Sequence, residues 1–172
     1  MGVFGSSLPE PGSRDYEQAR EVGRRLARAG SAVVCGGTGG TMEAACRGAS
    51  EEGGESIGVV LAGREPNAWV THAVVAGDLS ERLRRLRDLT DAWIFLPRGL
   101  GTLLELVWIC ESIVKGDVPA RPLVLLGDFW KATAELALAE ASRPEGRSAL
   151  AAVVRFAASP DQAVELALEA ES

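Results

Sequence analysis

Lysine, histidine and aromatic residues are scarce in this chain of 172 residues. Lys115 and Lys131 are its only lysines, and His72 is its only histidine. Aromatic residues make up 5% of the sequence, whereas hydrophobic residues make up 47%. This composition predicts a core of Ala, Val, Leu and Ile in a single domain spanning residues 1–172. A chain of this length is expected to bury about 70% of its unfolded surface.

The two lysines are poorly placed for two common kinds of chemistry. A P-loop requires a lysine directly after its glycines, and decarboxylation with pyridoxal phosphate requires a lysine that forms a Schiff base. Lys115 instead precedes a Gly-Asp turn, and Lys131 begins a helical segment. The sequence therefore argues against a P-loop NTPase and against a pyridoxal-phosphate decarboxylase. His72, which precedes a weak strand, is interpreted as a surface or loop histidine rather than a general base.

Cysteines are few and lack the spacing of metal ligands. Cys35, Cys46 and Cys110 lie far apart in the chain, which is typical of reduced structural thiols in a cytoplasmic protein. We therefore expect a cytoplasmic protein with no metal site and no cofactor.

Net positive charge and long apolar runs are also lacking. The net charge is −6 and the pI is about 4.9, which argues against nucleic acid and anionic membranes as partners. No apolar run reaches the roughly 18 residues of a membrane span. The opening "MGVFGSS" has no basic segment before an apolar one and is not expected to be a signal peptide.

Short β-branched runs alternate along the chain with longer segments of helical periodicity. Strands are expected at 2–5, 32–35, 56–61, 73–75, 92–96, 122–126 and 152–156. Helices are expected at 15–29, 79–89, 102–114 and 129–141, and a closing helix begins after Ser159. A further helix is expected to begin at the glycine turn that follows residue 35 and to end at 53–54. The stretch "SRPEGRSAL" (142–150) is expected to be a turn. This alternation predicts a doubly wound α/β domain, with a parallel sheet of six or seven strands and helices on both faces.

Three of the strand-to-helix junctions are rich in small residues. They are Gly5-Ser6-Ser7, the run from Gly36 to Thr41, and the run from Pro97 to Thr102. Glycines let the backbone approach a ligand closely, and the N-terminus of the following helix favours an anion. Ligands of such sheets lie beyond the carboxyl ends of the strands. The three junctions together predict a site for a phosphate-bearing ligand, although their spacing does not fit the GxGxxG fingerprint of dinucleotide enzymes.

The stretch "DAWIFLPRGLGTLLEL" resembles the PGGxGTxxE signature of the LOG family, the cytokinin riboside 5′-monophosphate phosphoribohydrolases, which are often labelled lysine decarboxylase-like. Upstream, "LSERLRRLRDLTDAW" is similar to a family stretch in which Arg82 falls on an arginine and Asp91 on an aspartate. "VFGSS" and "CGGTGGTMEAACRGA" resemble the family's first two nucleotide loops. The second loop is closer to that of a bacterial branch of the superfamily. The resemblance spans roughly residues 2–130.

This resemblance implies hydrolysis of the N-glycosidic bond of a nucleoside 5′-monophosphate to a free base and ribose 5-phosphate. It implies Arg82 and Glu105 as the catalytic residues. The residues implied in substrate or phosphate binding are Gly5, Ser6, Gly36, Gly37, Thr38, Arg98, Gly99, Gly101 and Thr102. The position of Glu105 agrees with such a role, because a lone carboxylate in an apolar helix requires a partner or a function. Without the motif, Arg82 would be one member of a solvated basic face.

Two departures from the family pattern leave alternatives open. Arg98 replaces the second glycine of PGG, and Leu83 replaces the lysine that follows the family arginine. Arg98 could strengthen phosphate binding, select another ligand or fill the site. The alternative functions are a non-catalytic nucleotide or phosphate-cofactor carrier with the same pocket, or an interaction protein. Glu43 is either a second acid facing the ligand or an ordinary acid in the first turn of a helix.

The segment from Thr102 to Val114 is apolar on nearly every helical face. Such a helix is either fully buried or shared with a partner, and the LOG family is understood to pair subunits near it. We therefore expect a homodimer or a higher even oligomer, since closed twofold contacts are the commonest arrangement.

Overall fold

The computed structural model describes residues 1–169, which form an alternating series of strands and helices. The strands are β1 (Gly2–Phe4), β2 (Val33–Cys35), β3 (Ser56–Leu61), β4 (His72–Ala76), β5 (Trp93–Phe95), β6 (Leu123–Leu126) and β7 (Val154–Ala157). The helices are α1 (Arg14–Arg28), α2 (Thr41–Glu51), α3 (Leu79–Asp88), α4 (Leu100–Lys115), α5 (Lys131–Glu140), α6 (Pro144–Val153) and α7 (Pro160–Leu168).

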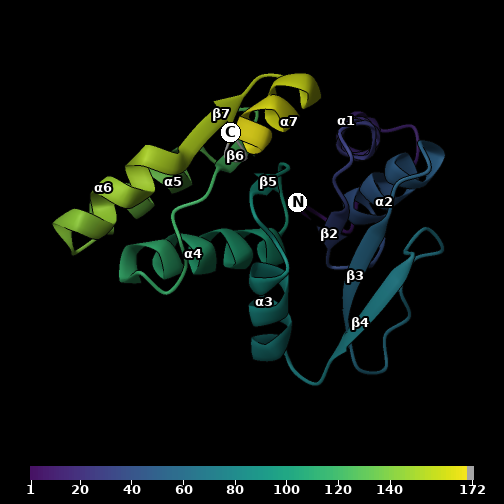
Figure 1. Cartoon of the computed structure of the whole chain (residues 1–172), viewed down its shortest axis with the longest axis horizontal. Helices are drawn as coiled ribbons and strands as arrows, with labels where there is room; N and C mark the ends of the chain where they lie inside the picture. Colours follow the sequence, from purple (N-terminus) through teal and green to yellow (C-terminus); the bar gives the residue numbers. More distant parts are fainter. Residues whose placement is uncertain (170–172) are drawn as a thin grey trace.

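All seven strands form one parallel sheet in the order β4-β3-β2-β1-β5-β6-β7 (Figure 1). The chain moves outward from β1 to β4, returns through α3 to the centre, and then moves outward in the other direction from β5 to β7. The predicted doubly wound fold is thus confirmed, and its switch of direction lies between β1 and β5. Because ligands of such sheets bind at this switch point, the topology directs attention to the carboxyl ends of β1 and β5.

Two apolar layers cover the two faces of the sheet. One layer packs α1, α2 and α7 against side chains such as Val3 and Ile94. The other packs α3, α4, α5 and α6 against side chains such as Phe4 and Phe95, whose rings lie 5.1 Å apart. Successive strand residues therefore belong to opposite layers, as the two-residue period of a strand requires.

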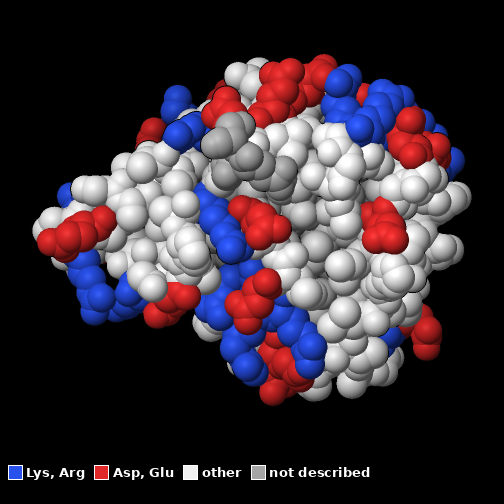
Figure 2. Space-filling model, in the orientation of Figure 1, with Lys and Arg blue, Asp and Glu red and all other residues white. Residues whose placement is uncertain are grey.

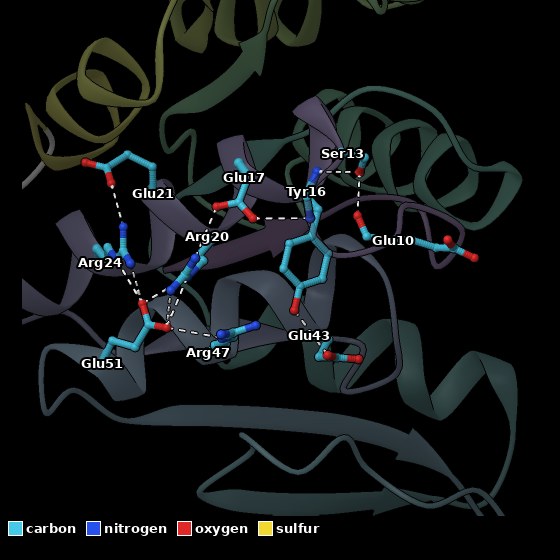
Figure 3. A network of polar contacts seen from close by, with 11 residues as sticks. Glu10, Ser13, Tyr16, Glu17, Arg20, Glu21, Arg24, Glu43, Arg47 and Glu51 are labelled. Carbon is cyan, nitrogen blue, oxygen red and sulfur yellow. Dashed lines mark hydrogen bonds and ion pairs between the residues drawn. The ribbon is translucent and has the colours of Figure 1, made fainter.

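Helices α1 and α2 approach each other closely because glycines lie at their contact. A Cβ at Gly23 would lie 2.0 Å from the Ala45 carbonyl oxygen, and one at Gly48 would lie 1.9 Å from the Arg20 carbonyl oxygen. At the solvent edge of this contact, Glu51 accepts hydrogen bonds from Arg20 and Arg24 (Figure 3). The Arg20 guanidinium, with a contribution from Arg24, lowers the pKa of Glu51 to about 2.

One expected element is wrong. The stretch 142–150 was expected to be a turn, but Pro144–Val153 forms helix α6. Pro144 occupies the first helical turn, where its fixed φ angle suits a helix and its missing N–H costs nothing. Gly146 packs against α4, where a Cβ would lie 2.3 Å from the Val114 carbonyl oxygen. The proline and glycine that suggested a turn therefore serve the start and the packing of a helix.

Helix α4 is buried on one side only. Leu106, Ile109 and Ile113 pack into the core, whereas Leu104 is 41% exposed and Val107 is 48% exposed. The apolar character of α4 is thus explained in part by the core, and an exposed apolar strip remains on its outer side.

The surface carries charges of both signs, and within residues 1–169 no helix is long and apolar enough to cross a membrane. Figure 2 shows basic and acidic side chains interspersed over α3. Arg85 pairs with Glu81 at 2.7 Å and Arg87 with Asp88 at 2.8 Å. Most of the basic charge of this helix is therefore neutralised locally.

Candidate active site

A cavity of about 360 Å³ lies at the carboxyl ends of β1 and β5, at the switch point of the sheet. Its volume falls in the range of small-molecule sites, about 300–1,000 Å³. Residues from four separate parts of the chain line it: Gly5, Ser6, Ser7, Leu8, Thr38, Met42, Arg82, Gly99, Leu100, Gly101, Thr102 and Glu105. All three small-residue junctions thus meet at one place.

The first two junctions are joined to each other by hydrogen bonds. The Ser6 carbonyl oxygen accepts from the Thr41 backbone N–H at 2.9 Å and from the Thr41 hydroxyl at 3.0 Å. Gly40 has a φ of 68°, and a Cβ there would lie 2.4 Å from the Ser6 carbonyl oxygen. The glycine is needed both for its backbone conformation and for this close approach.

The third junction presents the N-terminus of α4 to the cavity. Gly99 precedes the helix with a φ of 99°, and no side chain caps the first turn. The Thr102 hydroxyl is buried and has no hydrogen-bond partner within the described part of the chain. A buried hydroxyl without a partner is costly, and it lies beside backbone N–H groups that suit an anion. This turn therefore has the geometry that suits an anion.

Glu105 follows Thr102 by one turn of α4 and faces Arg82 across the cavity. The Glu105 residue is 7% exposed. Its Oε1 lies 3.5 Å from Arg82 Nη1, which is longer than the roughly 2.7–2.9 Å of a strong charge-assisted hydrogen bond. The pair is therefore loose.

Burial raises the pKa of the Glu105 carboxyl to about 7, and the nearby Arg82 guanidinium opposes this rise only in part. A buried carboxyl that titrates near neutral pH inside a cavity is a common property of catalytic acids and bases.

Arg82 reaches the cavity because a glycine makes room for it. Its Nε donates to the Val59 carbonyl oxygen at 2.9 Å, and its Nη2 donates to the Gly36 carbonyl oxygen at 3.4 Å. A Cβ at Gly36 would lie 2.0 Å from Arg82 Nη2. Arg85, on the same helix, pairs instead with Glu81 at the surface. The structure thus separates Arg82 from the other arginines of α3.

Arg98 lies away from this cavity. Its backbone has a φ of 73°, and Arg98 is the only non-glycine residue with a positive φ within residues 1–169. Its side chain is 70% exposed, with Nε 3.7 Å from Asp15 Oδ2 and the guanidinium 5.8 Å from the centre of the Phe129 ring. Arg98 therefore keeps the backbone conformation that a glycine adopts easily, and its side chain does not fill the cavity. Its role in phosphate binding stays a prediction.

Most of the other site residues named from the sequence come together. The cavity is lined by Gly5, Ser6, Thr38, Gly99, Gly101 and Thr102. Gly36 and Gly37 immediately precede Thr38 in the sequence and are not among the lining residues. Leu83 is buried, with 6% exposure. His72 is exposed, 3.9 Å from Glu55, in keeping with its interpretation as a surface histidine.

Sequence reasoning missed part of the lining. Leu8, Met42 and Leu100 add apolar surface to the cavity, and Asn67 fixes the glycine turn from a neighbouring loop. One signal could have indicated Asn67: it lies in the polar loop after the third expected strand, at the same edge of a parallel sheet.

The chain is similar in sequence to proteins of one known family. The model of the SLOG cluster4 family matches residues 1–139. A cytokinin riboside 5′-monophosphate phosphoribohydrolase of Rhodococcoides fascians is 30% identical over 132 residues, which are 73% of this chain and 66% of that protein. The chain thus spans slightly less than two thirds of that relative.

Solved structures of similar fold include a molybdenum cofactor binding protein and a molybdenum cofactor carrier protein. A molybdenum cofactor binding protein from Rippkaea orientalis matches with a TM-score of 0.78 and 25% identity, covering 99% of this chain and 96% of that one. A molybdenum cofactor carrier protein from Chlamydomonas reinhardtii matches with a TM-score of 0.70 and 25% identity, covering 95% and 92%.

Proposed function

Because this chain belongs to the SLOG cluster4 family, we propose that it hydrolyses the N-glycosidic bond of a nucleoside 5′-monophosphate. The products are the free base and ribose 5-phosphate. The Rhodococcoides relative and the family match confirm the resemblance to the LOG family. The observation that carries the proposal is the buried Glu105 carboxyl beside Arg82, in the same cavity as an uncapped helix N-terminus.

The 5′-phosphate binds at the start of α4 in this proposal. Backbone N–H groups from Gly99 to Thr102 donate to its oxygens, and the free hydroxyl of Thr102 supplies a further donor. An anion there also interacts favourably with the positive end of the helix dipole. Anchoring the phosphate at this turn places the ribose toward Glu105, one helical turn further along.

The Glu105 carboxylate assists cleavage of the bond between C1′ and the base nitrogen. As that bond breaks, its electron pair leaves with the base and positive charge develops on the ribose ring. A carboxylate nearby stabilises this charge and orients a water that adds to C1′. The water's proton balances the negative charge of the departing base. The Arg82 guanidinium, 3.5 Å away, favours the ionised form of Glu105.

A second candidate function is the binding of a phosphate-bearing cofactor without turnover. The structural match to the Rippkaea orientalis protein, which extends over 99% of this chain, favours it. The same uncapped turn and the same cavity would hold such a ligand, and the exposed Arg98 could contact a part of it that extends beyond the cavity.

A panel of nucleoside 5′-monophosphates tests the choice between these functions. We expect at least one nucleotide to release free base and ribose 5-phosphate. Chromatography of the base would detect this release. Tight binding of a nucleotide with no base released over many hours would contradict hydrolysis and support the carrier function.

The exposed strip on α4 supports the proposal that the chain forms a homodimer or a higher even oligomer. Leu100, Leu104 and Val107 are exposed to 82%, 41% and 48% along this helix, and Leu100 also lines the cavity. A twofold contact here would cover apolar surface beside the site. Light scattering at micromolar concentration is expected to give twice the monomer mass or an even multiple of it; a monomer mass would refute the proposal.

A further inference from the structure

A second, open groove of about 780 Å³ adjoins the first cavity, and Thr38 lines both. Its walls come from the glycine turn, from the first turn of α2, and from the loop after β3. Gly39, Glu43, Gly63 and Asn67 line it, and so do Arg64 and Glu65, which bring one charge of each sign. A ligand whose phosphate lies at the start of α4 can therefore extend past Thr38 into this groove.

The loop after β3 is held firmly against the glycine turn. The Asn67 side-chain nitrogen donates to the carbonyl oxygens of Gly37 at 3.2 Å and Thr38 at 2.9 Å. The Asn67 backbone N–H donates to the Gly37 carbonyl oxygen at 2.8 Å, and the Asn67 side-chain oxygen accepts from the Trp69 N–H at 3.0 Å. The groove is thus a pre-formed surface beside the cavity.

Glu43 supplies an oriented carboxylate to this groove. The buried Tyr16 hydroxyl donates to Glu43 Oε1 at 3.1 Å (Figure 3). Within residues 1–169 the Glu43 carboxylate forms no ion pair, and the nearby Arg47 hydrogen-bonds to the same Tyr16 hydroxyl and pairs with Glu51 at 3.1 Å. Gly39 leaves the space in front of it open, because a Cβ there would still be 4.0 Å from Glu43 Oε2. The carboxylate keeps free acceptor positions on both oxygens.

A carboxylate that forms no ion pair favours a ligand group that offers hydrogen-bond donors to it over a group that offers only acceptors. Resting on the proposed function, we infer that Glu43 selects nucleotides whose base carries adjacent donors, as guanine does. Guanine presents a ring N–H next to an exocyclic NH2, which together match the two oxygens of a carboxylate. Adenine presents an acceptor nitrogen in the corresponding position, which a carboxylate repels.

The shape of the groove agrees with a flat ring. Gly39 and Gly63 on its walls carry no side chains to obstruct a planar base. The ribose would then span the junction at Thr38, between the phosphate turn and Glu43. In this order C1′ lies at the Thr38 junction, where the groove opens into the cavity that Glu105 lines.

Binding of GMP, IMP and AMP, measured by calorimetry in the Glu105→Gln background, tests the inference without turnover. We expect GMP to bind most tightly and AMP most weakly, with about 10–100-fold between them, the range that hydrogen bonds to a charged group provide. Adding Glu43→Gln should reduce the difference between GMP and AMP to within about threefold, since the amide replaces one acceptor by a donor. Tyr16→Phe, which removes only the orienting hydroxyl, should give an intermediate difference.

Glu135→Gln on the exposed surface of α5 serves as the matched control and should leave the order of affinities unchanged. Equal affinities for GMP and AMP in the parent protein, or an unchanged preference in Glu43→Gln, would overturn the inference while leaving hydrolysis intact. Binding of none of the three nucleotides would overturn the inference, and the wider panel would then decide on hydrolysis. A GMP preference without any base release in the Glu105-containing protein would retain the inference and refute the hydrolysis alone.

Discussion

Glu105→Gln is expected to lower turnover of the nucleotide by about 10²–10³-fold, the usual cost of removing one electrostatic group that stabilises a transition state. Glutamine keeps the shape of the side chain and removes the negative charge that stabilises the positive charge on the ribose ring. Binding of the nucleotide should change far less, because the proposed phosphate donors lie between Gly99 and Thr102. Steady-state rates and calorimetric affinities measured on the same preparation would separate the two effects.

The rate should also depend on pH in a defined direction. Burial raises the pKa of Glu105 to about 7, and the carboxylate is the active form in the proposed mechanism, so the rate should rise with pH through about 7. The folded state binds this proton more tightly than the unfolded chain does. The stability that Glu105 contributes is therefore fully present at low pH and is lost as the pH rises through about 7.

Glu105→Gln should remove both pH effects, and Glu111→Gln on the exposed surface of the same helix is its control. A wild-type rate in Glu105→Gln would refute the assigned role even if hydrolysis itself were observed. A rate that falls between pH 6 and 8 would instead indicate that the protonated carboxyl acts as an acid.

Arg82→Ala is expected to lower turnover by about 10²-fold or more, again the scale of a lost charged group in a site. Its guanidinium is the cation that opposes the rise in the pKa of Glu105. Without it, the rise of rate with pH should shift to higher pH, an effect that a merely structural role would not produce. Arg82→Lys should restore the pH profile in part, since it keeps the charge but not the contacts to Val59 and Gly36.

Arg85→Ala is the matched control for Arg82, because Arg85 lies on the same helix and pairs with Glu81 at the surface. It should leave both the rate and the pH profile unchanged. Equal losses in Arg82→Ala and Arg85→Ala would show that the basic helix acts through its overall field, and the special place of Arg82 would have to be abandoned.

The sequence predicted the layout of the sheet well, because its strands are short, buried and separated by strong helix signals. Ser13, Asp78 and Ser159 cap α1, α3 and α7 with their side chains, which is the local chemistry that marks a helix start. The exception, α6, begins at a proline and contains a glycine. Local propensity alone could not show that Gly146 would be needed for contact with α4.

The glycine junctions could be found from sequence because parallel strands place their carboxyl ends together, whatever the order of the strands. The pairing of Arg82 with Glu105 could not be found from periodicity, since Arg82 is one of several arginines on α3. Only the resemblance to a family motif singled it out. Arg82 reaches Glu105 because Gly36, which follows β2, leaves space for its guanidinium. This is a tertiary contact that local sequence does not show.

The position of Arg98 shows another limit of sequence reasoning. A cation next to a glycine-rich turn left several roles open, and the structure shows that its side chain turns toward Asp15 and Phe129. Side-chain direction here follows from a backbone in the left-handed region, which is rare for residues other than glycine. No pattern of residue types in the sequence predicts that direction.

The switch point between β1 and β5 also determines how occupancy of the site is linked to unfolding. One wall of the cavity belongs to the first half of the chain, from Gly5 to Arg82, and the other to the segment from Gly99 to Glu105. A ligand held between them loses its site when either half unfolds. Its binding free energy therefore adds to the free energy of unfolding of the whole domain, by about 2.7 kcal/mol at a ligand concentration of about 100 Kd.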